Sequence, residues 1–246
     1  MKYLKKFENH AAYAAAESGL ILPNVSLCVQ ENEVHYNPST PPTPQHDYIE
    51  IGGLKWATMN IGANNVTDIG LYFQWGDTQG YTIEQVGSSE GQKYFGWADY
   101  KFNPSGDEET MTKYNSTDGK TVLDAEDDAA TAAWGGNWRM PTSVEFQTLG
   151  AAVTTAWTAN YQGSGAPGLV LIDKTDESNV LFFPACGSCS NGGLSGLGGY
   201  GNYWSSSLYS SNVQYAYGMN FFNGYVDWQG YGDRCVGFTV RGVLDE

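Results

Sequence analysis

The sequence contains few basic residues: 12 Lys and Arg stand against 27 Asp and Glu, and the formal net charge is −15. Nucleic acids and anionic membrane surfaces are bound through clustered Lys and Arg. We therefore expect neither as a partner. No apolar run approaches the length of a membrane span, so membrane insertion is not expected either.

Histidine and cysteine are also scarce, which restricts the possible chemistry. The histidines are His10, His35 and His46, and the cysteines are Cys28, Cys186, Cys189 and Cys235. Because every histidine precedes the main domain, no triad or histidine-based metal site is expected within it. Four scattered cysteines make no disulfide framework, and the lone Cys186-Gly-Ser-Cys189 motif lacks two of the four ligands of a structural zinc site. We predict a protein that is not an enzyme, with no cofactor and no metal.

The N-terminal region lacks the unbroken apolar core of a signal peptide, since Glu8, Asn9 and Glu17 interrupt it. Apolar residues at helical spacing predict a helix over residues 3–18, and alternation over 25–36 predicts a short pair of strands. The Pro-rich run that follows is typical of an extended linker. We therefore divide the chain into an N-terminal segment (1–38), a linker (39–47) and a main domain (48–246).

The main domain is predicted to be β-dominated and rich in loops, because it combines many Gly and Tyr residues with short alternating runs. Strands are expected in 48–62 and 71–77, in a covered hairpin of 169–173 and 180–185, and at the end of the chain with Val236, Phe238 and Val240 inward. The glycine-rich segment 187–202 is predicted to be a loop.

Two short helices are expected within this domain. The first is predicted to be capped by Asp124, to run through Ala133 and to end at Gly135-Gly136. The acids at 124, 126, 127 and 128 suit the first turn of this helix, and a metal site is the alternative. The second opens with a capping box from Thr142 to Glu145 and is expected to bury Val144, Phe146 and Leu149.

The most informative stretch is a hairpin around Asn223-Gly224, which favours a two-residue type I′ turn. Such a turn places Phe222 opposite Tyr225 and Gly218 opposite Gln229. One face then carries a predicted core of Tyr217, Met219, Phe221, Val226 and Trp228. The opposite face carries Gly218, Asn220, Phe222, Tyr225, Asp227 and Gln229, with Tyr231 and Asp233 just beyond. This mixture suits ligand recognition, and an ordinary solvated face is the alternative.

Six blocks in order resemble the Fibrobacter-type major paralogous domain. They are LKWATMNIGA (54–63), YFQWGD (72–77), LDAEDDAA (123–130), WGGNWRMPTSVEF (134–146), FFPACG (182–187) and YWSSS (203–207). The resemblance covers about residues 48–243 and implies an α+β domain with the C-type-lectin-like fold of formylglycine-generating enzymes. The family is abundant in gut bacteria and their phages.

The C-terminal part also resembles the variable region of diversity-generating retroelement proteins, in which mutated codons vary a ligand-binding surface. The resemblance adds Tyr200, Asn202, Leu208, Tyr209, Tyr215, Tyr231, Gly232, Asp233 and Gly237 to the candidate ligand-binding residues. Gln229 does not arise from the AAC codons that such systems vary. The N-terminal segment is similar to leader segments of gut phage structural proteins.

These resemblances imply a receptor-binding protein on a phage virion, or at the cell surface by a non-classical route if the protein is bacterial. The expected partner is a protein or glycan on a bacterial surface, and residues 1–38 are expected to assemble copies of the chain. One alternative is a fixed-specificity lectin whose Tyr209, Tyr225, Trp228 and Tyr231 stack on sugars, although the predicted inward position of Trp228 counts against that residue. Another is a formylglycine-generating-type enzyme that uses Cys186 with Cys189 or Cys235. The CGSC spacing departs from that enzyme family, and the EPN or QPD motif of calcium-dependent lectins is absent.

Overall fold

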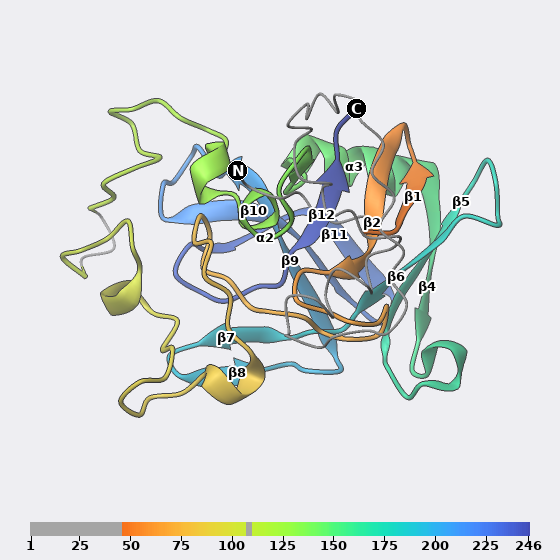
Figure 1. Ribbon diagram of the computed structural model, residues 1–246, viewed down its shortest axis with the longest axis horizontal. Helices are drawn as coiled ribbons and strands as arrows, with labels where there is room; N and C mark the ends of the chain where they lie inside the picture. The colour runs from red at the N-terminus through yellow and green to blue at the C-terminus, as the bar shows by residue number, and fades with distance from the viewer. Residues whose placement is uncertain (1–45, 107–109) are drawn as a thin grey trace, which may run out of the picture. The chain divides into compact units, whose positions relative to one another are not determined.

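The computed structural model describes residues 46–106 and 110–246 (Figure 1). The predicted helix at 3–18, the strands at 25–36 and nearly all of the 39–47 linker lie outside the described residues, as do His10, His35 and Cys28. His46, at the end of the predicted linker, stacks on the Trp134 ring with the two ring centroids 4.2 Å apart. In the described residues, no helix is long and apolar enough to cross a membrane.

In the described residues, the strands of each sheet pair in antiparallel fashion and form four sheets. Figure 1 shows their arrangement. The largest contains β1 (Tyr48–Ile51), β2 (Leu54–Asn60), β12 (Arg241–Leu244) and β3 (Trp138–Arg139) in that order. A second sheet orders β4 (Val153–Thr158), β5 (Gly168–Asp173) and β6 (Val180–Pro184), and a third orders β11 (Tyr225–Asp233), β10 (Tyr215–Phe222) and β9 (Tyr200–Leu208). The fourth is a small hairpin of β7 (Ser188–Ser190) and β8 (Gly193–Ser195). With two short helices besides, the domain has the predicted α+β class.

Several predicted strands differ from the observed ones. The hairpins at 48–60 and 168–184 are confirmed. The run 71–77 forms only single bridges, such as Phe73 to Phe238, because loop segments rather than full strands lie beside it. The last regular strand is β12, and the Val236–Val240 region ahead of it likewise makes isolated bridges. The predicted loop 187–202 contains the β7–β8 hairpin, in which Cys189 pairs with Leu194.

The two helices form where expected, but two details of the predictions are wrong. Helix α2 (Ala129–Trp134) is capped by Asp128, whose carboxylate accepts the amides of Ala130 and Thr131 at 2.9 Å, whereas Asp124 precedes only a single 3-10 turn, Ala125–Asp127. Helix α3 (Ser143–Ala152) has the predicted capping box and buries Phe146 and Leu149. Val144 is 65% exposed. Residues two apart on an α-helix point to nearly opposite sides, so Val144 points away from the core that Phe146 enters.

Two hydrophobic cores lie on either side of the β9 strand, and adjacent residues of β9 enter different cores. Trp204 belongs to the first core, which also contains Trp75, Ala216 and Phe238. Tyr203 belongs to the second core, with Trp56, Phe146, Met219 and Phe221 among others. Side chains alternate between the faces of a strand, so the β9–β10–β11 sheet separates the two cores. This arrangement decides which parts of the sheet remain exposed.

Candidate ligand-binding surface

The hairpin turn differs from the predicted type. Phe222 pairs with Tyr225, so the turn has the expected two residues. Gly224 has a φ of 86°, but Asn223 does not adopt a positive φ. A type I′ turn needs positive φ at both positions, whereas a type II turn needs it only at the second. The type I′ prediction is therefore wrong, although the predicted connection length is right.

A β-bulge changes the register of the hairpin beyond its first pairs. Asn220 faces Asp227 as predicted, but Gly218 faces Gly230 rather than Gln229. Between these two pairs, β10 advances by two residues, from Asn220 to Gly218, while β11 advances by three, from Asp227 to Gly230. The extra residue therefore lies at Trp228-Gln229. A bulge inserts one residue into one strand and reverses its alternation relative to the partner. Beyond this point, every β11 side chain lies on the face opposite to the predicted one.

The predicted core face is correct at the turn end of the hairpin and wrong at the other end. Met219 and Phe221 are buried in the second core, and Val226 and Trp228 pack against it. Tyr217 lies on the same face of β10 as Met219, but it is opposite Tyr231 and outside both cores. Tyr217 was expected inside and is instead a partly exposed residue of the sheet surface.

The opposite face of β10 has the reverse distribution. Ala216 and Gly218 are buried at the end away from the turn, where Ala216 belongs to the first core. Nearer the turn, the same face carries Phe222, which is 43% exposed. The two cores thus cover opposite faces of the sheet at its two ends. The uncovered halves, one on each face, carry the exposed aromatic residues.

These exposed residues form two separate clusters. The tip cluster consists of Tyr200, Phe222 and Tyr225, whose ring centroids lie 5.7 Å (Tyr200 to Phe222) and 5.2 Å (Phe222 to Tyr225) apart. The tyrosine cluster consists of Tyr209, Tyr215, Tyr217 and Tyr231. Within it, Tyr209 stacks on Tyr231 at 4.8 Å and meets the edge of Tyr217 at 5.1 Å. The two clusters lie on opposite faces of one sheet, and the bulge in β11 places Tyr231 on the face of Tyr215 and Tyr217.

The structure brings most, but not all, of the predicted ligand-binding residues to these surfaces. Those at least partly exposed are Tyr200, Asn202, Tyr209, Tyr215, Asn220, Phe222, Tyr225, Asp227, Gln229, Tyr231, Gly232 and Asp233. Leu208, Gly218 and Gly237 are buried, which removes them from the candidate surface. A Cβ atom at Gly237 would lie 2.6 Å from the Phe95 ring, and one at Gly232 would lie 2.8 Å from Phe238. Both glycines therefore point at packed aromatic rings.

Two residues near the surface were missed by sequence reasoning. Tyr217 was placed inside because the core was expected to cover that whole face of β10, whereas the second core covers only its turn end. Arg234 drew no attention, yet it is fully buried and supports the loops beside the tyrosine cluster. Its guanidinium donates to the carbonyl of Val213 at 2.9 Å and to the Tyr100 hydroxyl at 2.9 Å. A lone Arg between Asp233 and Cys235 at a strand end was the only available signal.

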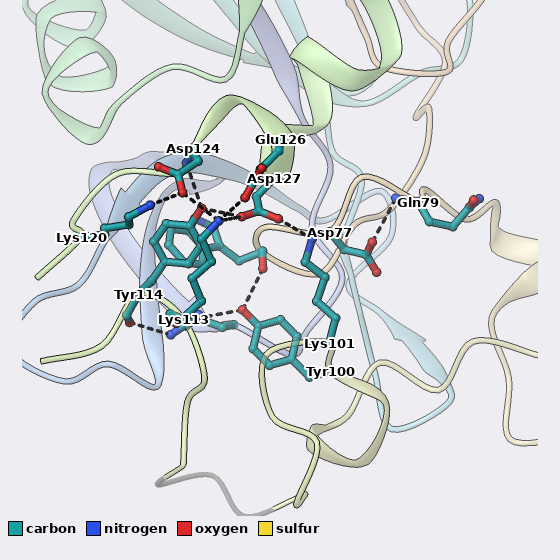
Figure 2. Close-up of polar contacts among 12 residues, drawn as sticks. Asp77, Gln79, Tyr100, Lys101, Lys113, Tyr114, Lys120, Asp124, Glu126 and Asp127 are labelled. Carbon is teal, nitrogen blue, oxygen red and sulfur yellow. Dashed lines mark hydrogen bonds and ion pairs between the residues drawn. The ribbon is translucent and has the colours of Figure 1, made fainter. Parts of the chain in front are cut away.

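A charged network continues from this arginine, and Figure 2 shows it around Lys113. The Lys113 ammonium lies 2.7 Å from Asp124, 2.7 Å from Glu126 and 2.6 Å from Asp127. Ligand oxygens of these three acids all lie within 4.8 Å of one another. Lysine therefore sits among them where a metal ion would bind, and the arrangement favours a structural role. Hydrogen bonds from Lys113 and Lys120 lower the pKa of Asp124 to about 2.

The three cysteines of the described residues are held in the core rather than at a surface. Cys186, Cys189 and Cys235 are buried, and the Cys186 sulfur lies 3.0 Å from the Tyr203 hydroxyl. Burial raises the pKa of Cys186, and it raises the pKa of Cys189 to about 12. The thiolate is the reactive form of cysteine. Both environments therefore disfavour nucleophilic use of these residues.

Comparisons of the chain with protein-family models, with curated proteins and with solved structures found no match. The functional argument therefore depends on the structure itself, namely on the two aromatic clusters, their exposure to solvent and the polar groups beside them.

Proposed function

We propose that the protein is a non-enzymatic binding protein with a C-type-lectin-like fold, carried on a phage particle, that grips a receptor on a bacterial surface. One observation carries the proposal: the exposed aromatic residues gather on one sheet. The largely exposed aromatic side chains of the described residues are Tyr48, Tyr94, Tyr200, Phe222, Tyr225 and Tyr231. Four of these six lie on β9 and the β10–β11 hairpin.

Aromatic residues in such positions suit protein recognition. Tyr and Phe bring large contact areas with few rotatable bonds, and aromatic anchors carry much of the binding energy at interfaces. Asn220, Asp227 and Gln229, on β10 and β11, add polar groups that adapt to different partners. Monomeric domains expose few contiguous aromatic patches without a use for them. Ligand binding by these clusters therefore explains their exposure.

Sequence diversification at this surface is part of the proposal. Substitutions at Phe222, Tyr225 or Tyr231 change exposed side chains and leave both cores intact. Sequencing this locus in related isolates tests the idea. Substitutions should concentrate at exposed positions between 200 and 233 and spare buried Leu208 and Gly218. An even spread of substitutions over the domain would contradict diversification.

Receptor binding itself is tested with purified protein on a panel of gut bacterial cells. Once a binding strain is found, Tyr225→Ala and Tyr231→Ala each test one cluster, and Tyr48→Ala is the matched control on β1. Loss of an aromatic anchor should weaken binding about tenfold or more. The control should bind as the wild type does. Equal binding by all three variants would contradict the proposal.

A fixed-specificity lectin is the second candidate, favoured by the flat tyrosine rings of both clusters. Trp228 packs against the second core, so it is not a platform for sugars, whereas Tyr209, Tyr225 and Tyr231 remain available. Glycan-array hits that disappear with Tyr225→Ala or Tyr231→Ala would favour this candidate. Hits that persist in both variants would exclude these rings as the sugar platform.

A further inference from the structure

Within the described residues, two hairpins share an Asn-Gly turn and form a matched pair. Asn223-Gly224 connects β10 to β11, and Asn191-Gly192 connects β7 to β8. Each turn has two residues, and both asparagines are exposed. An asparagine that precedes glycine is prone to lose its side-chain amide, because glycine has no side chain to hinder attack by its backbone nitrogen. The surroundings of each turn therefore decide whether this reaction occurs.

The Asn191-Gly192 turn is held by hydrogen bonds and close packing. The Gly192 amide donates to the carbonyl of Tyr94 at 2.6 Å, and the Asn191 amide donates to the carbonyl of Phe95 at 3.2 Å. A Cβ atom at Gly192 would lie 2.9 Å from the backbone of Gly87, so this turn packs against another segment. The turn has little room to change its shape.

The Asn223-Gly224 turn is not restrained in this way. Within the described residues, neither the Gly224 amide nor the Asn223 side chain makes a hydrogen bond. A Cβ atom at Gly224 would have no neighbouring atom within 4 Å, and both residues are exposed. The backbone nitrogen of Gly224 and the side-chain amide of Asn223 are therefore able to approach each other.

We propose that Asn223 is a site of spontaneous deamidation, by which the protein alters its own binding surface with time. The Gly224 nitrogen loses its proton to a base in the solvent and attacks the side-chain carbonyl carbon of Asn223. A new C–N bond forms, the bond to the side-chain nitrogen breaks, and ammonia leaves. Water then opens the succinimide at either carbonyl, which gives aspartate or isoaspartate. Water is the only co-reactant.

The position of Asn223 links this reaction to the tip cluster. Phe222 and Tyr225 flank the turn, and their stacked ring centroids lie 5.2 Å apart. Isoaspartate adds a methylene group to the main chain of the turn, and turn length sets the pairing of the flanking residues. Isoaspartate should therefore displace the two rings. The reaction itself does not depend on a receptor, whereas its effect on binding rests on the proposed function.

The two turns can be compared in one sample. The full-length protein is incubated at pH 8 in water labelled with heavy oxygen, and mass spectrometry follows the peptides that contain Asn223 and Asn191. The label separates deamidation during incubation from deamidation during digestion. Asn223 should react at least about tenfold faster, because Asn191 reacts only after the Gly192 hydrogen bond opens. Equal rates in the native protein, or no reaction at Asn223, would overturn the proposal.

Unfolded protein is the control for local sequence. In guanidinium chloride both turns are lost, so Asn223 and Asn191 should react at similar rates. An equally large difference in the unfolded chain would show that adjacent residues, rather than the turn, select Asn223, and would overturn the structural argument. Asn223→Ser should abolish the reaction at this position and leave the rate at Asn191 unchanged.

Cell binding separates this proposal from the receptor proposal. On a strain that the fresh protein binds, wild type aged at pH 8 should bind several-fold more weakly, whereas Asn223→Ser should bind equally before and after ageing. Deamidation of Asn223 without any change in binding would support the modification and contradict a role for the tip cluster in receptor binding. Weaker binding after ageing with Asn223 intact would overturn the modification and leave the receptor proposal in place.

Discussion

Tyr217 and Tyr231 lie directly opposite each other on β10 and β11, and both rings contact Tyr209. This pairing exists because β11 carries one extra residue at Trp228-Gln229. Without the bulge, Tyr231 would lie on the same sheet face as Tyr225. One additional residue therefore moves Tyr231 to the sheet face that carries Tyr215 and Tyr217, away from the tip cluster. A partner that contacts one cluster leaves the other accessible.

Gly218 should tolerate no side chain. A Cβ atom there would lie 2.5 Å from the backbone carbonyl oxygen of Tyr203, so Gly218→Ala forces the strands to shift. We expect a loss of about 1–3 kcal/mol in the free energy of unfolding, measured by urea denaturation. Gly199→Ala is the control, because the nearest atom to its Cβ is 3.6 Å away and its φ is not positive. Similar losses in the two variants would contradict the packing explanation.

Phe146 and Val144, two residues apart on α3, should respond very differently to truncation. Phe146 is fully buried in the second core, so Phe146→Ala should destabilise the domain by about 3–5 kcal/mol. Val144 is exposed, and Val144→Ala should change stability by less than about 0.5 kcal/mol. Denaturant midpoints of both variants check this. A large loss with Val144→Ala would contradict the exposed position of Val144.

The ion pairs of Lys113 should make the free energy of unfolding depend on pH in the acid range. Hydrogen bonds from Lys113 and Lys120 lower the pKa of Asp124 from 3.8 to about 2, so its ionised form is favoured in the folded state. A lowered carboxyl pKa contributes stability above pH 4, and this contribution disappears as the pH falls towards 2. Lys113→Met should flatten this decrease.

Urea midpoints measured between pH 2 and pH 7 test the network, with Lys174→Met as the control. Lys174 donates to the carbonyl of Ala151, so its replacement should leave the acid dependence as in the wild type. If the urea midpoints of Lys113→Met fall with pH as steeply as those of the wild type, Lys113 is not the source of the acid dependence.

The buried thiols should be inert in the native protein. In a Cys28→Ser background, Cys186, Cys189 and Cys235 should not react with a thiol reagent at pH 8, because they are buried and the pKa values of Cys186 and Cys189 are raised. All three should react in urea. Rapid native labelling of Cys186 would instead revive the alternative of a cysteine-dependent enzyme.

Local sequence signals were sufficient for much of the secondary structure. The Asn223-Gly224 turn, the capping box at Thr142 and the glycine that ends α2 depend on neighbours within a few residues. The antiparallel α+β class follows from many such short signals together. The capping residue of α2 was misassigned because several acids in succession can each serve as a cap, and the choice depends on how the chain enters the helix.

The sequence by itself therefore determined the hairpin, the class of the domain and the gathering of tyrosines near the C-terminus. Tertiary structure alone decided which tyrosines share a face. A bulge leaves no clear mark in the sequence, and only the observed pairing of Gly218 with Gly230 locates it. Because two cores cover opposite faces of one sheet at its two ends, no single alternation of residues along β10 or β11 could predict the exposed surface.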